Sequence, residues 1–243
     1  MSRPGSNREW IFWGRHDPLF AVASVPGREA GGDAPWTPEE FFETGRQYFA
    51  DVYRHWQQFG VGSAHCVEIG CGSGRITRQL VEHFRRVTAV DVSPDQLQNA
   101  RRLLGEDGRT VDLKLVSEPV LPLPDSSCDG VFSCEVFQHF DSHRPIATYL
   151  REANRVLVRG GTVCFQLPVQ GVHPALFLSS RPRLATLRIL RLLGRRRMMM
   201  YRQYPTALVL DLISRAKLQD GEMRLFHARG HSGLHAYFFA RKA

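Results

Sequence analysis

Three glycines at every second position, followed by one acid at the end of the next apolar run, constrain this chain more than any other feature. The first apolar run leads into Glu68-Ile69-Gly70-Cys71-Gly72-Ser73-Gly74-Arg75, and the second, Val87 to Val90, ends at Asp91. Glycine is needed where a backbone turns sharply and lets a ligand approach closely. An acid at the tip of the next strand is placed to hold two ribose hydroxyls. The pattern predicts a nucleoside-type cofactor across the carboxyl ends of two adjacent strands.

Apolar runs and helical patterns alternate along most of the 243 residues. This alternation predicts an α/β fold with a doubly wound, mostly parallel sheet. The last two strands have no helix between them, so they are expected to pair antiparallel. The expected strands are 64–69, 86–91, 111–116, 129–134, 161–167, 222–228 and 234–241, and the expected helices are 74–84, 94–104, 143–158 and 206–217.

Two segments fall outside this alternation. Residues 1–36 are rich in Gly, Pro and aromatic side chains, and we expect an irregular segment that packs as a cap. Thr37-Pro38-Glu39-Glu40 then has the pattern of a capping box, and the helix that it begins ends before Gly60. We therefore expect a cap and helix over 1–60 and one domain over 61–243. Residues 169–204 form a long insertion after strand five, interpreted as a lid-like segment.

The glycine spacing, Glu68-x-Gly70-x-Gly72-x-Gly74, differs from the dinucleotide fingerprint G-x-G-x-x-G. It resembles motif I of the class I S-adenosylmethionine-dependent methyltransferases of the small-molecule type, and Asp91 falls where that family has its ribose-binding acid. The resemblance extends to four further segments, at 121–131, 136–140, 156–161 and 236–242. It implies a seven-stranded Rossmann-like fold, S-adenosyl-L-methionine as cofactor, and methyl transfer. Two alternatives fit this spacing less well. One is a glycine-rich turn that binds no ligand, and the other is a nicotinamide-dependent enzyme.

The resemblance also implies which residues hold the cofactor. Glu68 is expected to order the loop and face the cofactor's ammonium group, with a solvated strand residue as the alternative. Ser117 occupies the position near the adenine where the family usually has Asp, and Glu118 follows; either could instead be a turn residue before Pro119. The full expected set is Glu68, Gly70, Cys71, Gly72, Gly74, Asp91, Val92, Ser117, Glu118 and Glu135.

His139 is the candidate catalytic residue, because it follows strand four by a few residues on the expected substrate side. A histidine changes its charge near neutral pH and so can act as a general base. The alternative is a histidine that caps or packs the next helix. Weaker candidates are His143, His173, His231 and His235.

The net charge of +8 comes from one segment, because residues 181–202 contain eight arginines and no acid. Arg188, Arg191 and Arg195 fall on one helical face beside a wide apolar arc. This face could belong to a lid, lie on an anionic membrane, or bind RNA. We favour the lid and expect a small-molecule substrate, with neither nucleic acid nor a stable membrane association as partner.

Composition narrows the remaining possibilities. No apolar run approaches the length of a membrane span, the N-terminus lacks the apolar region of a signal peptide, and we expect a cytoplasmic protein. The five cysteines lack zinc-ligand spacing, so we expect no metal. The sequence predicts a methyltransferase acting on a metabolite or secondary product at O, N or C. The alternatives are an RNA methyltransferase and a catalytically silent S-adenosylmethionine-binding regulatory protein.

Overall fold

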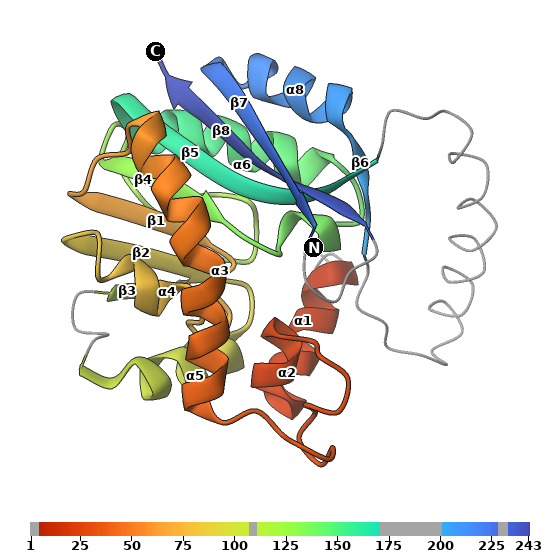
Figure 1. Cartoon of the computed structure of the whole chain (residues 1–243). Coiled ribbons are helices and arrows are strands. Elements are labelled where there is room, and N and C mark those ends of the chain that lie inside the picture. The colour runs from red at the N-terminus through yellow and green to blue at the C-terminus, as the bar shows by residue number, and fades with distance from the viewer. Residues whose placement is uncertain (1–4, 107–110, 171–200, 228–232) are drawn as a thin grey trace.

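The strands expected from the sequence form a single sheet in the computed structural model, which describes residues 5–106, 111–170, 201–227 and 233–243 (Figure 1). Seven strands follow the order β3-β2-β1-β4-β5-β8-β7, and the two-residue β6 pairs with β5. The bounds are β1 (His65–Ile69), β2 (Arg86–Asp91), β3 (Val111–Leu115), β4 (Cys128–Ser133), β5 (Leu157–Gln170), β6 (Tyr204–Pro205), β7 (Leu218–His227) and β8 (Leu234–Lys242).

Within the described sheet, β8 runs opposite to the other strands. The pairs among β1 to β5 are parallel, whereas β8 runs antiparallel to both β5 and β7. The expectation that the last two strands pair antiparallel is therefore confirmed, as is the doubly wound, mostly parallel fold. In an open sheet of this kind, ligands bind outside the carboxyl ends of the parallel strands.

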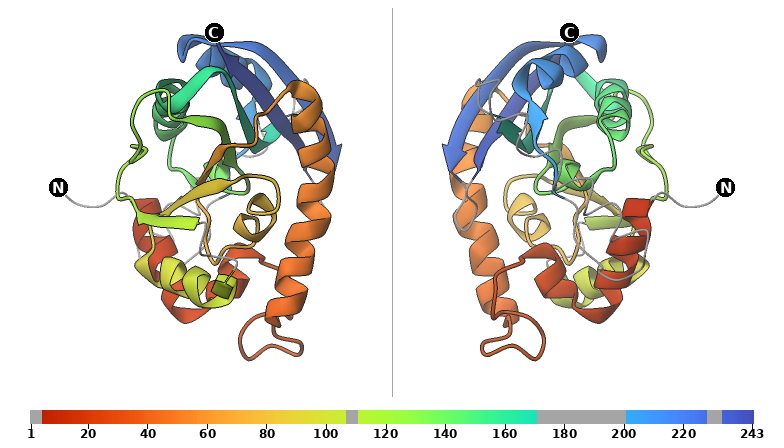
Figure 2. Two further views of the ribbon diagram at one scale, coloured as in Figure 1. Left: turned by 90° about the vertical axis from the view of Figure 1, so that its left-hand side faces the viewer. Right: turned by 90° about the vertical axis from the view of Figure 1, so that its right-hand side faces the viewer.

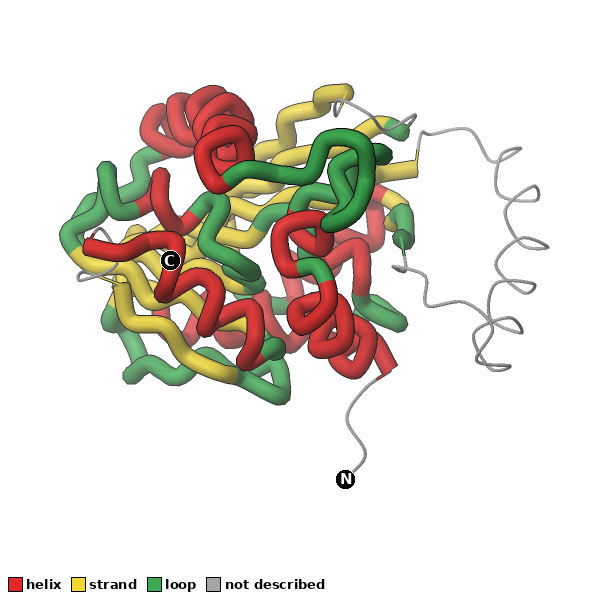
Figure 3. The backbone as a smooth tube through the Cα atoms, turned by 90° about the horizontal axis from the view of Figure 1, so that it is seen from below, coloured by secondary structure: helices red, strands yellow, loops and turns green. Residues whose placement is uncertain are grey.

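Helices cover both faces of the sheet (Figures 2 and 3). On one face, α3 (Pro38–Phe59), α4 (Thr77–Leu80) and α5 (Pro94–Leu104) contribute side chains to a shared apolar core. On the other face, α6 (Arg144–Val156) and α8 (Thr206–Arg215) pack against β4, β5 and β8. A short 3₁₀ helix, η2 (Phe137–His139), follows β4.

The longest helix, α3, is fixed at both ends and in its middle. Thr37 and Glu40 form the expected capping box, and Gly60 ends the helix with a positive φ of 99°. Trp56 is fully buried, and its Nε1 donates a hydrogen bond of 2.8 Å to Thr162 Oγ1 of β5. This contact holds α3 along the sheet and places its first half beside the carboxyl ends of the strands.

The N-terminal segment differs from the irregular cap that the sequence suggested. It contains two helices, α1 (Gly5–His16) and α2 (Pro18–Val22), which we call the cap. Gly14 lets α1 approach α5 closely, because a Cβ at this position would collide with Ser93 Oγ. Gly14, which has a low helix propensity, is thus the position at which two helices pack closely.

Two other expectations have different outcomes. A helix was expected over 74–84, but the α-helical part is only α4, because residues 70–76 form a succession of turns around the glycines. Most of the insertion at 169–204 lies outside the described residues, and only its ends, in β5 and from Tyr201 onward, are described. In the part of the chain that the structure describes, no helix combines the length and apolarity needed to cross a bilayer.

Candidate functional site

A pocket of about 1330 Å³ lies at the carboxyl ends of the parallel strands. Its walls come from the ends of β1, β2 and β4, the first half of α3, the cap and the last strands. Apolar atoms make up most of the exposed surface of its wall, with polar side chains set among them. The acids are Asp51, Glu68, Asp91 and Glu135, and Arg75 is the one lining arginine among the described residues. A concave, mostly apolar site with a few converging polar groups is the usual form of a small-molecule binding site.

The glycine loop forms the floor of this pocket. Gly70 and Gly72 have positive φ values of 76° and 52°, which side chains rarely adopt. A Cβ at Gly70 would collide with Val136, and a Cβ at Gly72 would lie 2.5 Å from Val22 of the cap. The loop is tied to the next strand, because the N–H groups of Gly70 and Cys71 donate to Val90 O at 2.8 and 3.1 Å. These positions therefore require glycine for both conformation and space.

Asp91 lies at the end of β2 and faces the pocket. Its Oδ2 accepts a hydrogen bond of 2.8 Å from the Gly72 N–H, and its Oδ1 accepts one of 2.9 Å from the Ser93 N–H. Burial raises the pKa of Asp91, and these N–H groups partly offset that rise. Each carboxylate oxygen has more than one lone pair, so the carboxylate fixes the loop and can still accept from a ligand.

Glu68 is almost completely buried at 4% exposure and also lines the pocket, so the solvated alternative is wrong. Its Oε2 accepts a hydrogen bond of 2.6 Å from Thr77 Oγ1 at the start of α4. Burial raises its pKa to about 7. A buried carboxyl of this kind gains from a cationic group placed beside it, because an opposite charge favours the ionised form.

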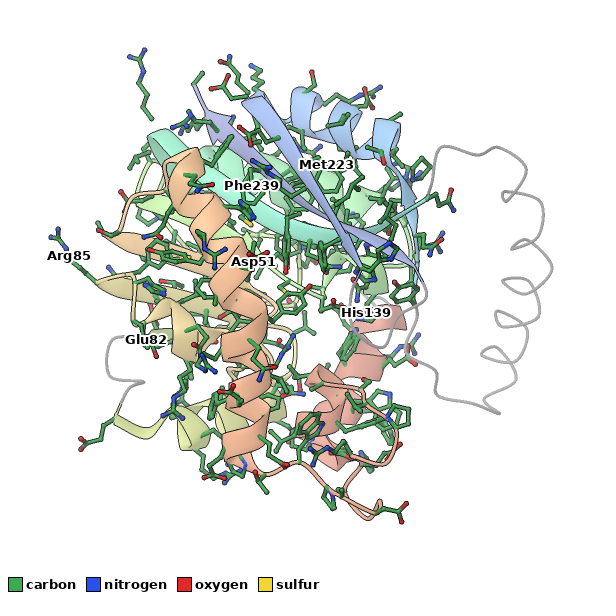
Figure 4. All side chains as sticks on the ribbon, in the orientation of Figure 1. Asp51, Glu82, Arg85, His139, Met223 and Phe239 are labelled. Atoms are coloured by element: carbon green, nitrogen blue, oxygen red, sulfur yellow. The ribbon has the colours of Figure 1, made fainter. Side chains whose placement is uncertain are left out.

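The cap crosses the pocket from the β3 side to the β4 side. Asn7 Nδ2 donates to Ser117 O at 3.0 Å, and the Trp10 ring lies edge-on to His139 with centroids 4.6 Å apart. Figure 4 shows His139 beside α1. Pro18 O accepts hydrogen bonds from Ser73 Oγ and from Gln96 Nε2, so the cap is also attached to the glycine loop.

Glu135 follows β4 and has a positive φ of 59°, which is uncommon for a residue with a side chain. Its carboxylate accepts a hydrogen bond from Gln138 Nε2 and a long one, 3.4 Å, from Tyr48 Oη. Its N–H donates to Gln166 Oε1 at 3.0 Å. Backbone strain held in place in this way often marks a functional position.

The contact to Gln166 continues as a chain of hydrogen bonds along the pocket wall. A backbone N–H can only donate, so Gln166 must present its Oε1 to Glu135 and its Nε2 to His235 Nδ1. His235 Nδ1 is then an acceptor, and in the neutral ring the proton lies on Nε2, 2.9 Å from Tyr201 Oη. Both Gln166 and His235 are buried, and Tyr201 lines the pocket. We call Glu135, Gln166, His235 and Tyr201 the wall chain.

The pocket contains most of the residues expected from the sequence. Those that line it are Glu68, Gly70, Cys71, Gly72, Asp91, Val92, Glu135 and His139. Gly74 packs on Leu104 instead, and Ser117 and Glu118 are exposed, while their neighbour Val116 lines the pocket. Of the weaker histidine candidates, His143 precedes α6, His235 belongs to the wall chain, and His173 and His231 lie outside the described residues.

Residues that the sequence did not single out as site residues are Tyr48, Arg75, Gln138 and Tyr201. They come from α3, the glycine loop, η2 and the end of the insertion. Arg75 and Gln138 lie in or beside the motifs at 68–74 and 136–140 without occupying a position that those motifs assign to a ligand. The one available signal was Arg75, a charged residue directly after the third glycine and before an apolar helix face.

The five cysteines are unpaired, and four are buried. Burial raises the pKa of Cys134 to about 12, so this thiol stays protonated at the edge of the pocket. Among the described residues, no group of three or more His, Cys, Asp or Glu side chains is arranged to hold a metal ion.

Known proteins share both sequence and fold with this chain. Residues 67–165 match a protein-family model described as a methyltransferase domain. Malonyl-[acyl-carrier protein] O-methyltransferase of Serratia marcescens is 36% identical over 123 residues, which cover 46% of this chain and 43% of that protein. Trans-aconitate 2-methyltransferase of Azoarcus sp. (strain BH72) is 35% identical over 109 residues, which cover 44% of this chain and 40% of that protein.

Among solved structures, the [4+2]-cyclase SpnF has a TM-score of 0.64 at 16% identity and covers 100% of this chain and 97% of its own. At this identity the likeness concerns the fold. The match to the two curated relatives spans less than half of their length.

Proposed function

We propose that this chain, whose residues 67–165 match a methyltransferase-domain model, is a class I S-adenosylmethionine-dependent methyltransferase that transfers a methyl group to a small molecule. One observation carries the proposal: the glycine loop and the Asp91 carboxylate line the same pocket. Gly72 and Asp91 are nineteen residues apart in the sequence, and a hydrogen bond joins them. The side chains of Val136 and Val22 already fill the space beside Gly70 and Gly72, so the support for a ligand comes from the pocket that the loop lines together with Asp91.

When bound, S-adenosylmethionine supplies an electrophilic methyl group on a sulfonium. The residues of the chain hold and orient the reactants. Asp91 accepts hydrogen bonds from the ribose hydroxyls, as an acid at the end of the second strand does in related folds. Glu68 provides negative charge for the ammonium group, and the glycine loop lies along the methionine end. The departing thioether is neutral, so no acid is needed there, and positioning accounts for much of the catalysis.

Two groups face the substrate side and are able to hold a proton. His139 is a candidate general base at the end of η2, and Glu135 offers a carboxylate fixed by Gln138 and Tyr48. A hydroxyl or amine must lose a proton in the course of methylation, and either group is a suitable acceptor. We assign the base to His139 and the orientation of the acceptor group to Glu135.

The small-molecule assignment rests on how the pocket is covered. Trp10 of the cap, Trp36 of the loop before α3, and Tyr48 of α3 line the pocket, so the substrate side is a hollow with aromatic walls. The similar proteins named above include an enzyme that acts on trans-aconitate, a small acid. Both facts support a metabolite or secondary product as substrate.

Calorimetric titration tests the cofactor, and conversion to S-adenosylhomocysteine in the presence of a metabolite extract tests the activity. We expect S-adenosylmethionine and S-adenosylhomocysteine to bind and NAD not to bind. Tight binding of NAD together with no response to S-adenosylhomocysteine would contradict the proposal.

A second candidate function is cyclisation of a substrate in which S-adenosylmethionine stays bound and is not consumed. It is favoured by the full-length similarity in fold to the [4+2]-cyclase SpnF and by 31% identity over 112 residues to the S-adenosyl-L-methionine-dependent Diels-Alderase iccD of Talaromyces variabilis. The same assay separates the two candidates. Methyl transfer releases S-adenosylhomocysteine in proportion to product, whereas a cyclase changes its substrate and leaves the cofactor intact.

His139→Ala tests the assignment of the base. We expect turnover to fall about 100-fold or more and cofactor binding to stay unchanged. His143→Ala is the matched control, because His143 precedes α6 and does not line the pocket. A His139 variant that loses stability but keeps its rate would show that the ring packs against Trp10 and takes no proton.

A further inference from the structure

The pocket contains a buried guanidinium group for which the surrounding residues provide no anion. Arg75 follows Gly74 directly, is 8% exposed, and lines the pocket. Its position is fixed by α3, because Gly45 packs against the Arg75 backbone so closely that a Cβ there would collide with Arg75 O. The side chain therefore lies between α3 and the glycine loop and cannot easily turn out to solvent.

The Arg75 guanidinium lacks some of the hydrogen-bond and ion-pair partners that a buried charge requires. Arg75 Cζ lies over the Tyr48 ring, 5.5 Å from its centroid, and Nε is a buried donor without a hydrogen-bond partner. Among the described residues, no carboxylate lies within 4.0 Å of the guanidinium nitrogens. A buried charge that is neither paired nor hydrogen-bonded is strongly unfavourable. The residues around the Arg75 guanidinium therefore do not supply the anion that its charge requires.

The nearest acid does not supply that anion. Glu68 is close enough for Arg75 to lower its pKa, but its carboxylate is bonded to Thr77. Burial keeps the pKa of Glu68 at about 7, so the group carries only part of a negative charge at neutral pH. A planar carboxylate brought in by a ligand would match the fork of donors that a guanidinium presents.

The geometry points to Arg75 as the residue that binds the α-carboxylate at the methionine end of the cofactor, an inference that rests on the proposed function. The glycine loop that carries Arg75 lies along this end of the site, and the α-carboxylate is the single anionic group of S-adenosylmethionine. Glu68 and Arg75 then form a pair of opposite charges for the ammonium and carboxylate groups of one amino-acid moiety.

The test compares two ligands and three proteins by calorimetric titration. S-adenosylmethionine carries the carboxylate, and decarboxylated S-adenosylmethionine keeps the sulfonium and ammonium but lacks it. For Arg75→Gln we expect affinity for S-adenosylmethionine to fall about 10- to 100-fold and affinity for the decarboxylated ligand to stay within threefold of wild type. Arg78→Gln is the matched control, because Arg78 also lies over an aromatic ring, that of Phe42, but does not line the pocket.

Other outcomes overturn the inference. An equal loss of affinity for both ligands would mean that Arg75 only supports the loop. Unchanged affinity for both would mean that Arg75 does not bind the cofactor's carboxylate, whether or not it binds a substrate carboxylate. Arg75→Lys, which keeps the charge but not the fork, covers the case in which Arg75→Gln does not fold; it should bind S-adenosylmethionine with intermediate affinity. If wild-type protein bound neither ligand, the proposed function itself would fail, which is a distinct result.

Discussion

Asp91 binds two backbone N–H groups and at the same time faces the pocket. Asp91→Ala should therefore weaken binding of S-adenosylhomocysteine by about 2–4 kcal/mol, because charge-assisted hydrogen bonds to the ribose are lost. Calorimetry measures the effect, and thermal unfolding shows whether the loop persists. Asp95→Ala is the control, since Asp95 lies on α5, pairs with Arg15 of α1 at 3.8 Å, and does not line the pocket. A change below threefold in a folded protein would remove Asp91 from the site.

Glu68 should make the stability of the apo protein depend on pH. Burial raises the pKa of its carboxyl from an ordinary 4.5 to about 7, so the folded chain keeps a proton that the unfolded chain releases. The stabilising contribution is full below about pH 4.5 and is lost as the pH rises through about 7. The free energy of unfolding should fall by roughly 3 kcal/mol at most over this range.

Urea unfolding of wild type and Glu68→Gln between pH 5 and 8 measures this contribution. Glutamine keeps the size of the side chain and a hydrogen-bonding partner for Thr77, but it does not titrate. The curve of the variant should be flatter than that of wild type over this interval. Parallel curves would show that Glu68 is ionised in the folded protein throughout.

Which site residues could be predicted depends on where their signal lies. Gly70, Gly72 and Asp91 belong to a local pattern of loop and strand end, and such patterns are visible in a single sequence. The wall chain is different, because Gln166 and His235 are 69 residues apart and meet only through the pairing of β5 with β8. No spacing in the sequence predicts that contact.

The capping box of α3 should stabilise the whole fold measurably. Thr37 Oγ1 accepts from the Glu40 N–H at 3.2 Å, and Glu40 Oε2 accepts from the Thr37 N–H at 3.3 Å. Thr37→Ala should lower the free energy of unfolding by about 1 kcal/mol, measured by chemical denaturation. The control is Thr148→Ala, because this hydroxyl bonds only back to Arg144 O within α6 and to an exposed arginine. An equal loss of unfolding free energy in both variants would show that the capping box stabilises the fold no more than an ordinary hydroxyl within a helix does.

At the level of elements, the sequence predicted the strands within a few residues, because buried parallel strands are continuous apolar runs. The elements it missed depend on tertiary contacts. Residues 5–16 form α1 despite Gly14, since that glycine is where α1 meets Ser93 of α5. The helix after the glycine loop is shorter than its apolar spacing indicated, because the loop's turns extend to Ile76.

At the level of the whole molecule, the arginine segment separates the functional alternatives. Residues 181–200 lie outside the described residues, and Arg202 is anchored near the pocket by its N–H to Gln138 O and its Nη2 to Asp141 O, each at 2.9 Å. Under the lid interpretation, replacing Arg188, Arg191 and Arg195 with Gln should leave cofactor affinity unchanged and shift the KM for substrate modestly.

We also expect no binding of RNA and no co-sedimentation with anionic vesicles at physiological salt. An RNA enzyme would show a steep salt dependence whose log–log slope falls by up to about three in the triple variant. Sub-micromolar RNA binding by wild type, abolished in that variant, would replace the small-molecule proposal with an RNA methyltransferase.

The hydrogen bonds of the wall chain all run in one direction. Glu135 donates through its backbone to Gln166, Gln166 donates to His235, and His235 donates to Tyr201, whose own proton therefore points away from His235. The two ends of the pocket wall are therefore chemically different: Tyr201 Oη accepts from His235 at one end, and the Glu135 carboxylate, which accepts from Gln138 and Tyr48, lies at the other. A substrate with two similar reactive positions will meet these ends in one orientation only. We expect a single regioisomer as product of the proposed reaction, because the two ends of the wall chain differ in their hydrogen-bonding groups.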